Sequence, residues 1–319
     1  MPECFTWLHL TDLHAGMKNQ GWLWPDIKEK FFEDLKKLTD KSGPVDLVLF
    51  TGDLTQKGSA EEFEKVDSIL TELWKVLKES GSEPVFLAVP GNHDLLRPAD
   101  EEDPLLILLT QWNEQPKVRE KFWNDQNTSY HQIVNRSFEN YRNWWNRLTI
   151  KPDNINDGML PGDFSATVRK ENAKLGIVGL NTAFLQLNSS DYKEKLAIHA
   201  RQFHKACGGD GPDWIKQHHA CLFMTHHPVS WLNREAQQQV NEHIMAYGRF
   251  AVHLCGHMHE TVYRNTEEAG TEARRLWQGR SLFGLEYFGD KKERREFGYN
   301  IGKIELAETQ GKLFFFPRQ

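Results

Sequence analysis

Six short apolar segments recur along the chain, and they limit most strongly the folds that it can adopt. Each has five or six residues and is rich in β-branched or aromatic side chains, which favours buried strands over helices. Between some of them, as in 27–38 and 60–79, apolar residues recur at helical spacing among charged ones. Strands that alternate with helices predict a layered α/β fold with parallel strands. The segments are 5–10, 46–50, 85–89, 175–180, 220–224 and 250–254.

Polar side chains that can bind metal follow five of these six predicted strands. The residues after the strands read TDLH, TGDL, PGNHD, THHP and CGHMH, and the strand 175–180 is followed by NTA. Each stretch alone could be an ordinary turn, because Pro, Gly, Asn and Asp are common turn residues. Open α/β sheets, however, bind their ligands outside the carboxyl ends of the strands. Five such ends in one chain favour a shared reactive site.

The candidate ligands at these strand ends are carboxylates, imidazoles and one amide, with no thiolate. Such ligands suit divalent zinc, manganese or iron. Seven ligands exceed what one tetrahedral ion takes, and they fit two ions that share a bridging carboxylate and leave positions for water and substrate. The D-x-H and H-x-H spacings allow both members of a pair to reach one site, since alternate side chains of an extended or turning segment point the same way. The candidates are Asp12, His14, Asp53, Asn92, His226, His257 and His259.

Composition narrows the class of protein. With 39% hydrophobic and 26% charged residues the chain is expected to be globular, and its net charge of -6 argues against a dedicated binder of long nucleic acid. The four cysteines are scattered without CxxC spacing, which argues against a disulfide framework and a thiolate zinc site. The start lacks the pattern of a signal peptide, and no apolar run approaches the length of a membrane span. A soluble, cytoplasmic protein that does not enter a membrane is expected.

Together these motifs resemble the five motifs of calcineurin-like metallophosphoesterases. D-x-H at 12–14, G-D at 52–53, G-N-H-D at 91–94, the His-Pro block at 225–228 and G-H-x-H at 256–259 occur in the family's order. They extend over most of the chain. The resemblance implies an α/β sandwich of two facing mixed β-sheets flanked by helices, as one domain over 1–319. It also implies a metal-dependent hydrolase of phosphoric esters.

The resemblance assigns roles to individual residues. Asp12, His14 and His259 would hold a first metal, Asn92, His226 and His257 would hold a second, and Asp53 would bridge them. His226 would be the ligand and His227 a neighbour that contacts substrate, because the family's ligand stands two residues before the proline.

The catalytic roles implied by the family concern the residues after the strand at 85–89. His93 would protonate the leaving oxygen or stabilise the phosphoryl charge, and Asp94 would orient the His93 ring. Hydroxide bound to the two ions, which are manganese, iron, zinc or similar, would be the nucleophile.

The residues after Asp53 distinguish branches of the family. Gln56 and Lys57 stand where the Ser/Thr phosphatases have Asp and Arg, and Gln56 replaces the tyrosine of purple acid phosphatases. The stretch GDLTQKGSAEEF is most similar to the bacterial branch that includes class III cyclic-nucleotide phosphodiesterases. A phosphodiesterase acting on a nucleotide or nucleic acid is therefore favoured over a monoesterase. The resemblance also suggests that the chain is the catalytic domain of a longer protein, fused to or acting with a signalling NTPase module.

Two other functions compete with this one. The first is an SbcD/Mre11-like DNA nuclease, because that branch of the family begins with a similar D-x-H-x-G, here DLHAG. The other is a catalytically silent scaffold that binds proteins. Because silent members of the family lose ligands or the acid histidine, and this chain keeps all of them, the scaffold is disfavoured.

The segment 97–165 separates GNHD from the next strand and is larger than a plain connection. It is rich in tryptophan, and apolar residues from 134 to 148 recur at helical spacing. One interpretation is a helical insertion that buries these aromatics in a small core. The other is a cap over the metals in which Trp112 and Trp145 stack on a nucleobase.

Past the last motif, 274–288 and 298–316 alternate like antiparallel strands, and they are expected to complete the second sheet, with 291–296 as a solvated loop.

Overall fold

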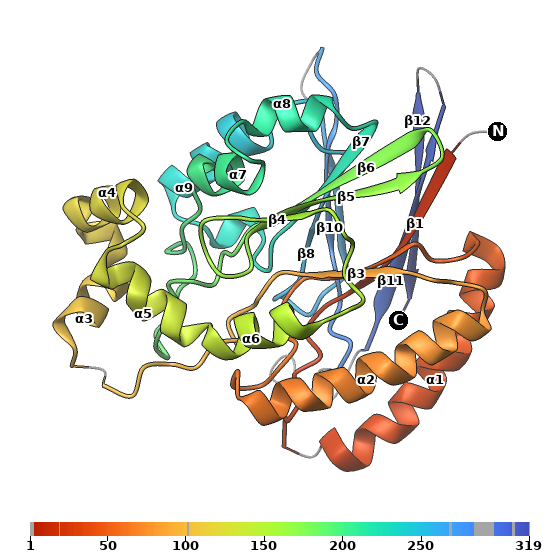
Figure 1. The fold of residues 1–319 in the computed structure, drawn as a ribbon, viewed down its shortest axis with the longest axis horizontal. Helices are drawn as coiled ribbons and strands as arrows, with labels where there is room; N and C mark the ends of the chain where they lie inside the picture. Colours follow the sequence, from red (N-terminus) through yellow and green to blue (C-terminus); the bar gives the residue numbers. More distant parts are fainter. Residues whose placement is uncertain are drawn as a thin grey trace.

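The computed structural model describes residues 3–18, 20–100, 102–267, 270–283, 297–307 and 310–318. Its strands form two sheets that face each other (Figure 1). The first has the order β12-β11-β1-β2-β3 and the second the order β4-β5-β6-β7-β8-β10-β9. The strands of the first sheet are β1 (Glu3–Leu10), β2 (Leu47–Phe50), β3 (Val85–Ala88), β11 (Tyr299–Leu306) and β12 (Gly311–Arg318). Those of the second are β4 (Ile155–Asp157), β5 (Phe164–Lys170), β6 (Ala173–Gly179), β7 (Ala220–Met224), β8 (Val252–Cys255), β9 (Val262–Thr266) and β10 (Arg274–Gln278).

Both sheets are mixed. Strands β1, β2 and β3 run parallel, β11 is added antiparallel beside β1, and β12 is added antiparallel beside β11. In the second sheet β6, β7, β8 and β10 are parallel, while β4, β5 and β9 run antiparallel to their neighbours. All six strands expected from the apolar segments are present, and the predicted α/β sandwich of two mixed sheets is confirmed.

Helices cover the outer faces of the two sheets. The helices α1 (Gln20–Ser42) and α2 (Ala60–Glu79) lie on the first sheet, and α7 (Ala200–Ala206), α8 (Gly211–Lys216) and α9 (Arg234–Gln238) lie on the second (Figure 1). Helix α2 begins with a capping box, in which Ser59 and Glu62 satisfy each other's backbone N–H groups. Its apolar stripe faces inward as the spacing predicts. In the described part of the chain, no helix has the length and apolar character needed to cross a membrane.

The C-terminal strands differ from expectation. Strand β10 joins the second sheet, but β11 pairs with β1 in the first sheet and carries β12 with it. The physical reason is that the otherwise unpaired edge of the buried strand β1 needs hydrogen-bond partners. Gly302 allows this pairing because its bare Cα lies against the ring of Trp7, where a side chain would collide. The predicted loop at 291–296 lies outside the described residues.

The insertion after β3 is helical over 104–147. It contains α3 (Pro104–Thr110), the short turn η1 (Trp112–Glu114), α4 (Pro116–Asn124), α5 (Ser129–Ser137) and α6 (Glu139–Arg147). The helical spacing from 134 to 148 belongs to two helices, which meet at Phe138. Residues 155–157 and 164–165 already belong to the second sheet, so the helical part is shorter than the predicted 97–165.

Candidate metal centre

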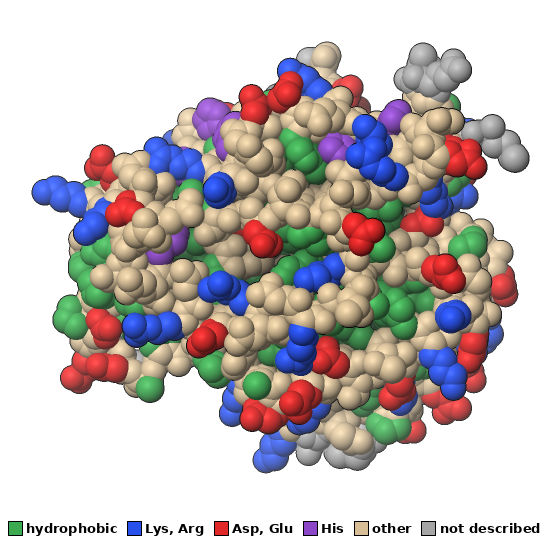
Figure 2. All heavy atoms as spheres, in the orientation of Figure 1, with side chains coloured by type: hydrophobic (Ala, Val, Ile, Leu, Met, Phe, Trp, Pro, Cys, Tyr) green, Lys and Arg blue, Asp and Glu red, His purple; other side chains and the backbone are tan. Residues whose placement is uncertain are grey.

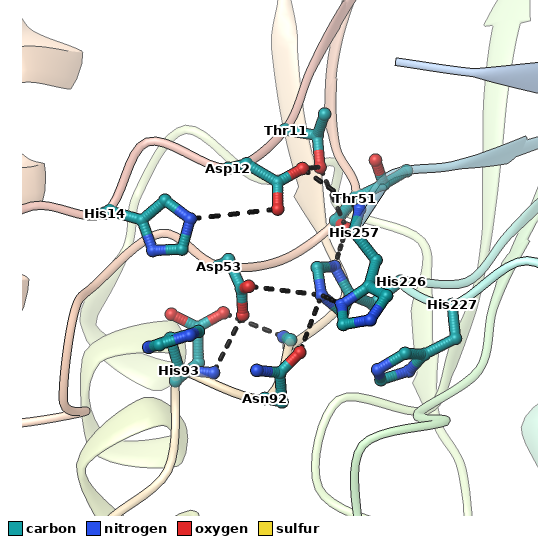
Figure 3. Close-up of polar contacts among 12 residues, drawn as sticks. Thr11, Asp12, His14, Thr51, Asp53, Asn92, His93, His226, His227 and His257 are labelled. Atoms are coloured by element: carbon teal, nitrogen blue, oxygen red, sulfur yellow. Dashed lines mark hydrogen bonds and ion pairs between the residues drawn. The ribbon is translucent and has the colours of Figure 1, made fainter. Parts of the chain in front are cut away.

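The seven predicted metal ligands come together at the carboxyl ends of strands from both sheets. All of them except His259 are labelled in Figure 3. The first sheet supplies Asp12 and His14 after β1, Asp53 after β2 and Asn92 after β3. The second supplies His226 after β7, and His257 and His259 after β8. Most of these side chains are buried, while His257 is half-buried. The rule that ligands bind at strand carboxyl ends therefore locates the cluster correctly.

His226 lies at the centre of a group of hydrogen-bond acceptors. Its Nδ1–H donates to the Thr51 carbonyl at 2.7 Å, because a carbonyl can only accept. In a neutral ring the lone pair of Nε2 then points toward Asp53 Oδ2 at 3.2 Å and Asn92 Oδ1 at 3.1 Å. Nδ1 of His257 lies 3.2 Å from the same nitrogen. Such a set of converging lone pairs requires a positive charge among them.

That charge is either a proton or a metal ion. Burial lowers the pKa of His226, but the carboxylates of Asp53 and Asp12 outweigh it and raise the pKa to about 9. A divalent cation supplies positive charge at the same place, and imidazole, amide and carboxylate are all suitable ligands. The donor set fits a metal ion.

A second group of potential metal-ligand atoms lies around Asp12. Its Oδ2 accepts hydrogen bonds from the Thr11 hydroxyl at 2.6 Å and from the His257 N–H at 3.1 Å. This leaves Oδ1 facing His259 Nε2 at 3.1 Å and His14 Nε2 at 3.9 Å. The two imidazole nitrogens approach each other to 3.5 Å. One carboxylate oxygen and two ring nitrogens thus converge on one point, as a first metal requires.

The protonation states suit ligation. Burial lowers the pKa of His14 to about 4 and that of His257 to about 3, so both rings are neutral near pH 7. Burial alone would raise the pKa of Asp53, but the charges of His226 and His93 hold it well below its ordinary value. Neutral imidazole and ionised carboxylate are the forms that bind metal, so His14, His257 and Asp53 are already in those forms, while His226 would release its proton when an ion binds.

Asp53 lies between the two groups. It shares one set of converging ligand atoms with Asp12 and His226 and another with His14 and His93, within 4.8 Å in each case. Its Oδ1 also accepts the backbone N–H of His93 at 2.8 Å, which fixes the carboxylate against the loop after β3. This position fits a carboxylate that bridges two ions.

The structure corrects the role predicted for Asp94. The ring of His93 is held by the Gln56 carbonyl, to which Nδ1–H donates at 2.8 Å, and not by Asp94. Asp94 is fully buried and accepts the N–H groups of Thr55 at 2.9 Å and Gly91 at 2.8 Å. Burial and the charge of Asp53 raise the pKa of Asp94 to about 6. Asp94 therefore fixes the loop that presents His93, because its carboxylate joins Gly91 in that loop to Thr55 after β2.

Gly91 permits the approach of this loop to Asp53. A Cβ atom at Gly91 would overlap the Asp53 carboxylate and backbone nitrogen. We expect Gly91→Ala to destabilise the protein by about 1–3 kcal/mol through overpacking and to weaken metal binding by displacing Asp53. Thermal unfolding and metal analysis of the purified variant would measure both effects. Gly21→Ala is the control, since nothing lies within 4 Å of a Cβ there. Wild-type metal content in Gly91→Ala would contradict this account.

The ligand residues have unusual backbone geometry. Five of the seven candidates have positive φ, a region that residues with side chains rarely occupy at a cost of about 1–3 kcal/mol each. Both members of the D-x-H pair and both of the H-x-H pair are among them, so these spacings act through turns and not through extended strands. The values are Asp12 54°, His14 49°, Asp53 56°, His257 71° and His259 54°.

Sequence reasoning missed the residues that hold the ligands. Threonines stand at the strand ends beside the motifs, and their hydroxyl or carbonyl groups bond to motif residues: Thr11 to Asp12, Thr51 to His226, and Thr182 and Thr225 to His227. The repeated threonine after a strand was the available signal. Trp231 was also missed; its ring centroid lies 4.0 Å from that of His257, and its Nε1–H donates to Met258 Sδ at 3.0 Å.

The predicted substrate contacts fall into two groups. His227 lies beside the cluster, with its ring centroid 4.4 Å from that of His257. Trp112 and Trp145 are both buried in aromatic packing. Trp112 packs on Phe122 and Phe184, and Trp145 packs on Phe164. Their surroundings support the interpretation of the insertion as an aromatic core more than that of a stacking cap.

Residues 5–261 match the family model for calcineurin-like phosphoesterase. A Staphylococcus aureus structure proposed to be a 5'-nucleotidase aligns with 99% of this chain at 11% identity and a TM-score of 0.48, and the chain spans 54% of that protein. A purple acid phosphatase from yellow lupin gives 11% identity and a TM-score of 0.45, over 99% of this chain and 54% of its own. A hypothetical protein from Thermus thermophilus gives 12% identity and a TM-score of 0.44, over 99% of this chain and 100% of its own. No curated protein matches the chain.

Proposed function

The chain belongs to the calcineurin-like phosphoesterase family, and on that premise we propose that it is a two-metal phosphodiesterase that hydrolyses a P–O bond of a nucleotide or nucleic acid. The family implies a hydrolase of phosphoesters. The preference for a diester is our own inference. It rests on the similarity of 52–63 to the cyclic-nucleotide phosphodiesterase branch, and on Gln56 and Lys57 at the positions where the Ser/Thr phosphatases carry Asp and Arg.

The observation that carries the proposal is the convergence of acceptors on His226. Nε2 of His226 lies 3.2 Å from Oδ2 of Asp53 and 3.1 Å from Oδ1 of Asn92. Buried lone pairs do not gather in this way without a cation, because each would lose its hydrogen bonds to water. A second group of converging ligand atoms, from Asp12, His14 and His259, lies on the other side of Asp53.

We assign the ligands as follows. Asp12, His14 and His259 would hold one ion, Asn92, His226 and His257 would hold the other, and Asp53 would bridge them. Bound divalent ions activate water and stabilise the charge of the phosphoryl group, and manganese, iron and zinc all suit these ligands.

His93 supplies the proton chemistry in this proposal. Its Nδ1–H is already donated to the Gln56 carbonyl, so Nε2 is the nitrogen left to transfer a proton. A ring protonated at Nε2 would give that proton to the leaving oxygen as the P–O bond breaks. The carbonyl of Gln56 also stabilises the protonated ring, and Asp94 acts by positioning the loop.

Surface charge favours a small substrate. In Figure 2, basic and acidic side chains are interspersed over the visible face, and the chain has a net charge of -6. A protein that binds long nucleic acid usually gathers its basic residues on one face. We therefore place a nucleotide-sized diester first. The cytoplasmic location and the association with a signalling NTPase module stay predictions.

One experiment tests both metal dependence and substrate class. Protein treated with a chelator and then supplied with manganese, iron or zinc is assayed with bis(p-nitrophenyl) phosphate, p-nitrophenyl phosphate, cyclic AMP and single- and double-stranded DNA. We expect no turnover without metal, and faster hydrolysis of the diesters than of the monoester after metal is restored. Metal should also raise the unfolding temperature, since a ligand at 100 times its Kd stabilises by about 2.7 kcal/mol.

Three results would contradict the proposal. A faster monoesterase reaction would reverse the substrate preference. Degradation of DNA without turnover of small diesters would favour the SbcD/Mre11-like nuclease. Two bound ions with no hydrolysis of any ester would favour the protein-binding scaffold.

A further inference from the structure

His227 is a buried histidine whose ring is fixed on one side and has no partner on the other. Nδ1 lies 2.9 Å from the hydroxyl oxygen of Thr182, and that oxygen also accepts the backbone N–H of His227 at 3.2 Å. The carbonyl of His227 accepts the Thr225 hydroxyl at 2.8 Å. The other ring nitrogen, Nε2, is buried and has no hydrogen-bond partner among the described residues.

The hydrogen bonds of Thr182 identify which ring nitrogen carries the proton. A hydroxyl has one hydrogen to donate, and Thr182 is fully buried, so this hydrogen needs an acceptor. Within the described ranges, Nδ1 of His227 is the acceptor found for it. The hydroxyl therefore donates to Nδ1, and in the neutral ring the proton is on Nε2. A ring nitrogen that carries a proton cannot bind a metal. We therefore assign His226, and not its neighbour His227, as a metal ligand.

The free donor lies beside the second group of metal ligands. The ring centroid of His227 is 4.6 Å from that of His226 and 4.4 Å from that of His257. A ring nitrogen of each of the three histidines lies within 4.8 Å of the others. A buried N–H without a partner destabilises a protein by about 1–3 kcal/mol. The Nε2–H of His227 lies next to the proposed metal site, where an anionic phosphoester would bind. We therefore infer that its hydrogen-bond acceptor is supplied by the substrate.

We propose that His227 is a substrate-binding residue whose Nε2–H donates a hydrogen bond to a nonbridging oxygen of the phosphoryl group. Thr182 is the positioning residue that keeps the proton on Nε2. The inference rests on the proposed function for the nature of the substrate, but it concerns binding of the anion and not the hydrolytic step. Inorganic phosphate, which carries the same oxygens as the phosphoryl group, is the probe.

The test compares variants of the metal-loaded protein by calorimetric titration with inorganic phosphate and by metal analysis. His227→Leu removes the donor, and we expect phosphate affinity to fall about tenfold to a hundredfold, the range for a hydrogen bond to a charged group. Both ions should remain bound. His227→Gln places an amide N–H₂ near the position of Nε2 and should recover most of the affinity. Thr182→Val frees Nδ1, and we expect a severalfold loss. His131→Leu, which removes a buried imidazole from α5, should bind phosphate as the wild type does.

Each outcome supports or overturns the proposal. Wild-type phosphate affinity in His227→Leu overturns it, as does loss of one metal ion in that variant, which would make His227 a ligand. If His227→Leu does not fold, unchanged affinity in Thr182→Val overturns it. A wild-type protein that binds two ions but no phosphate also overturns it. Binding of ions and phosphate with no ester hydrolysed would refute the proposed function alone.

Discussion

Asp53→Asn is expected to abolish hydrolysis and to leave the purified protein deficient in metal. The asparagine keeps an oxygen to accept the His93 N–H, so the loop after β3 should remain in place. It lacks the negative charge that balances two cations and the second oxygen that would bridge them. We expect the rate with bis(p-nitrophenyl) phosphate to fall by about a thousandfold or more, since a metal ion contributes several kcal/mol to transition-state stabilisation.

The measurement for Asp53→Asn is the hydrolysis rate in metal-replete buffer together with metal content by mass spectrometry. Asp40→Asn is the matched control, because this exposed aspartate lies near the end of α1, away from the cluster, and should behave as the wild type does. Full activity and two bound ions in Asp53→Asn would refute the bridging role.

His93→Ala should separate chemistry from metal binding. Removing a general acid lowers a rate by about a hundredfold to ten-thousandfold. We expect a loss of that size in kcat, largest for esters with poor leaving groups, because these depend most on proton donation. Both metal ions should stay bound, since the metal-binding histidines and carboxylates proposed here, and Asn92, are unchanged.

Metal content decides the interpretation of that variant. His93 also lies in a set of converging ligand atoms with His14 and Asp53, so the geometry allows it to bind metal. Loss of an ion in His93→Ala would make His93 a ligand. Equal loss of rate for good and poor leaving groups would instead show that it stabilises phosphoryl charge. His243→Ala changes an exposed histidine and controls for the loss of an imidazole.

Much of this fold was predictable because its strands are buried. The composition of the apolar segments at 46–50 and 220–224 favours buried strands, which the structure contains, and the predicted helical stripe at 60–79 has the same bounds as α2. The C-terminal strands were harder to place, because an alternating pattern indicates a half-buried strand without indicating its neighbour. The pairing of β11 with β1 depends on tertiary contacts, such as that of Gly302 with Trp7, which local patterns do not reveal.

The candidate site shows a similar division. Residue types and spacing identified the side chains that converge, because metal binding demands few kinds of donor. Residue type and spacing could not show which partner is contacted by a side chain that can serve either a structural or a functional role. Asp94 can cap a loop as well as it can orient a histidine, and Trp145 can fill a core as well as it can stack on a base. Those choices depend on the three-dimensional surroundings, here the N–H groups of Thr55 and Gly91 for Asp94 and the ring of Phe164 for Trp145.

The distribution of ligands over both sheets has a consequence for regulation. Each ion would draw ligands from β1–β3 on one side and from β7 or β8 on the other, so neither sheet alone can form a complete site. Metal affinity is therefore thermodynamically coupled to the closure of one sheet on the other. The stacked pair Trp7 and Trp277, one from each sheet with ring centroids 5.7 Å apart, contributes to that closure. A mutation that separates Trp7 from Trp277 is therefore expected to lower metal affinity although it changes no ligand.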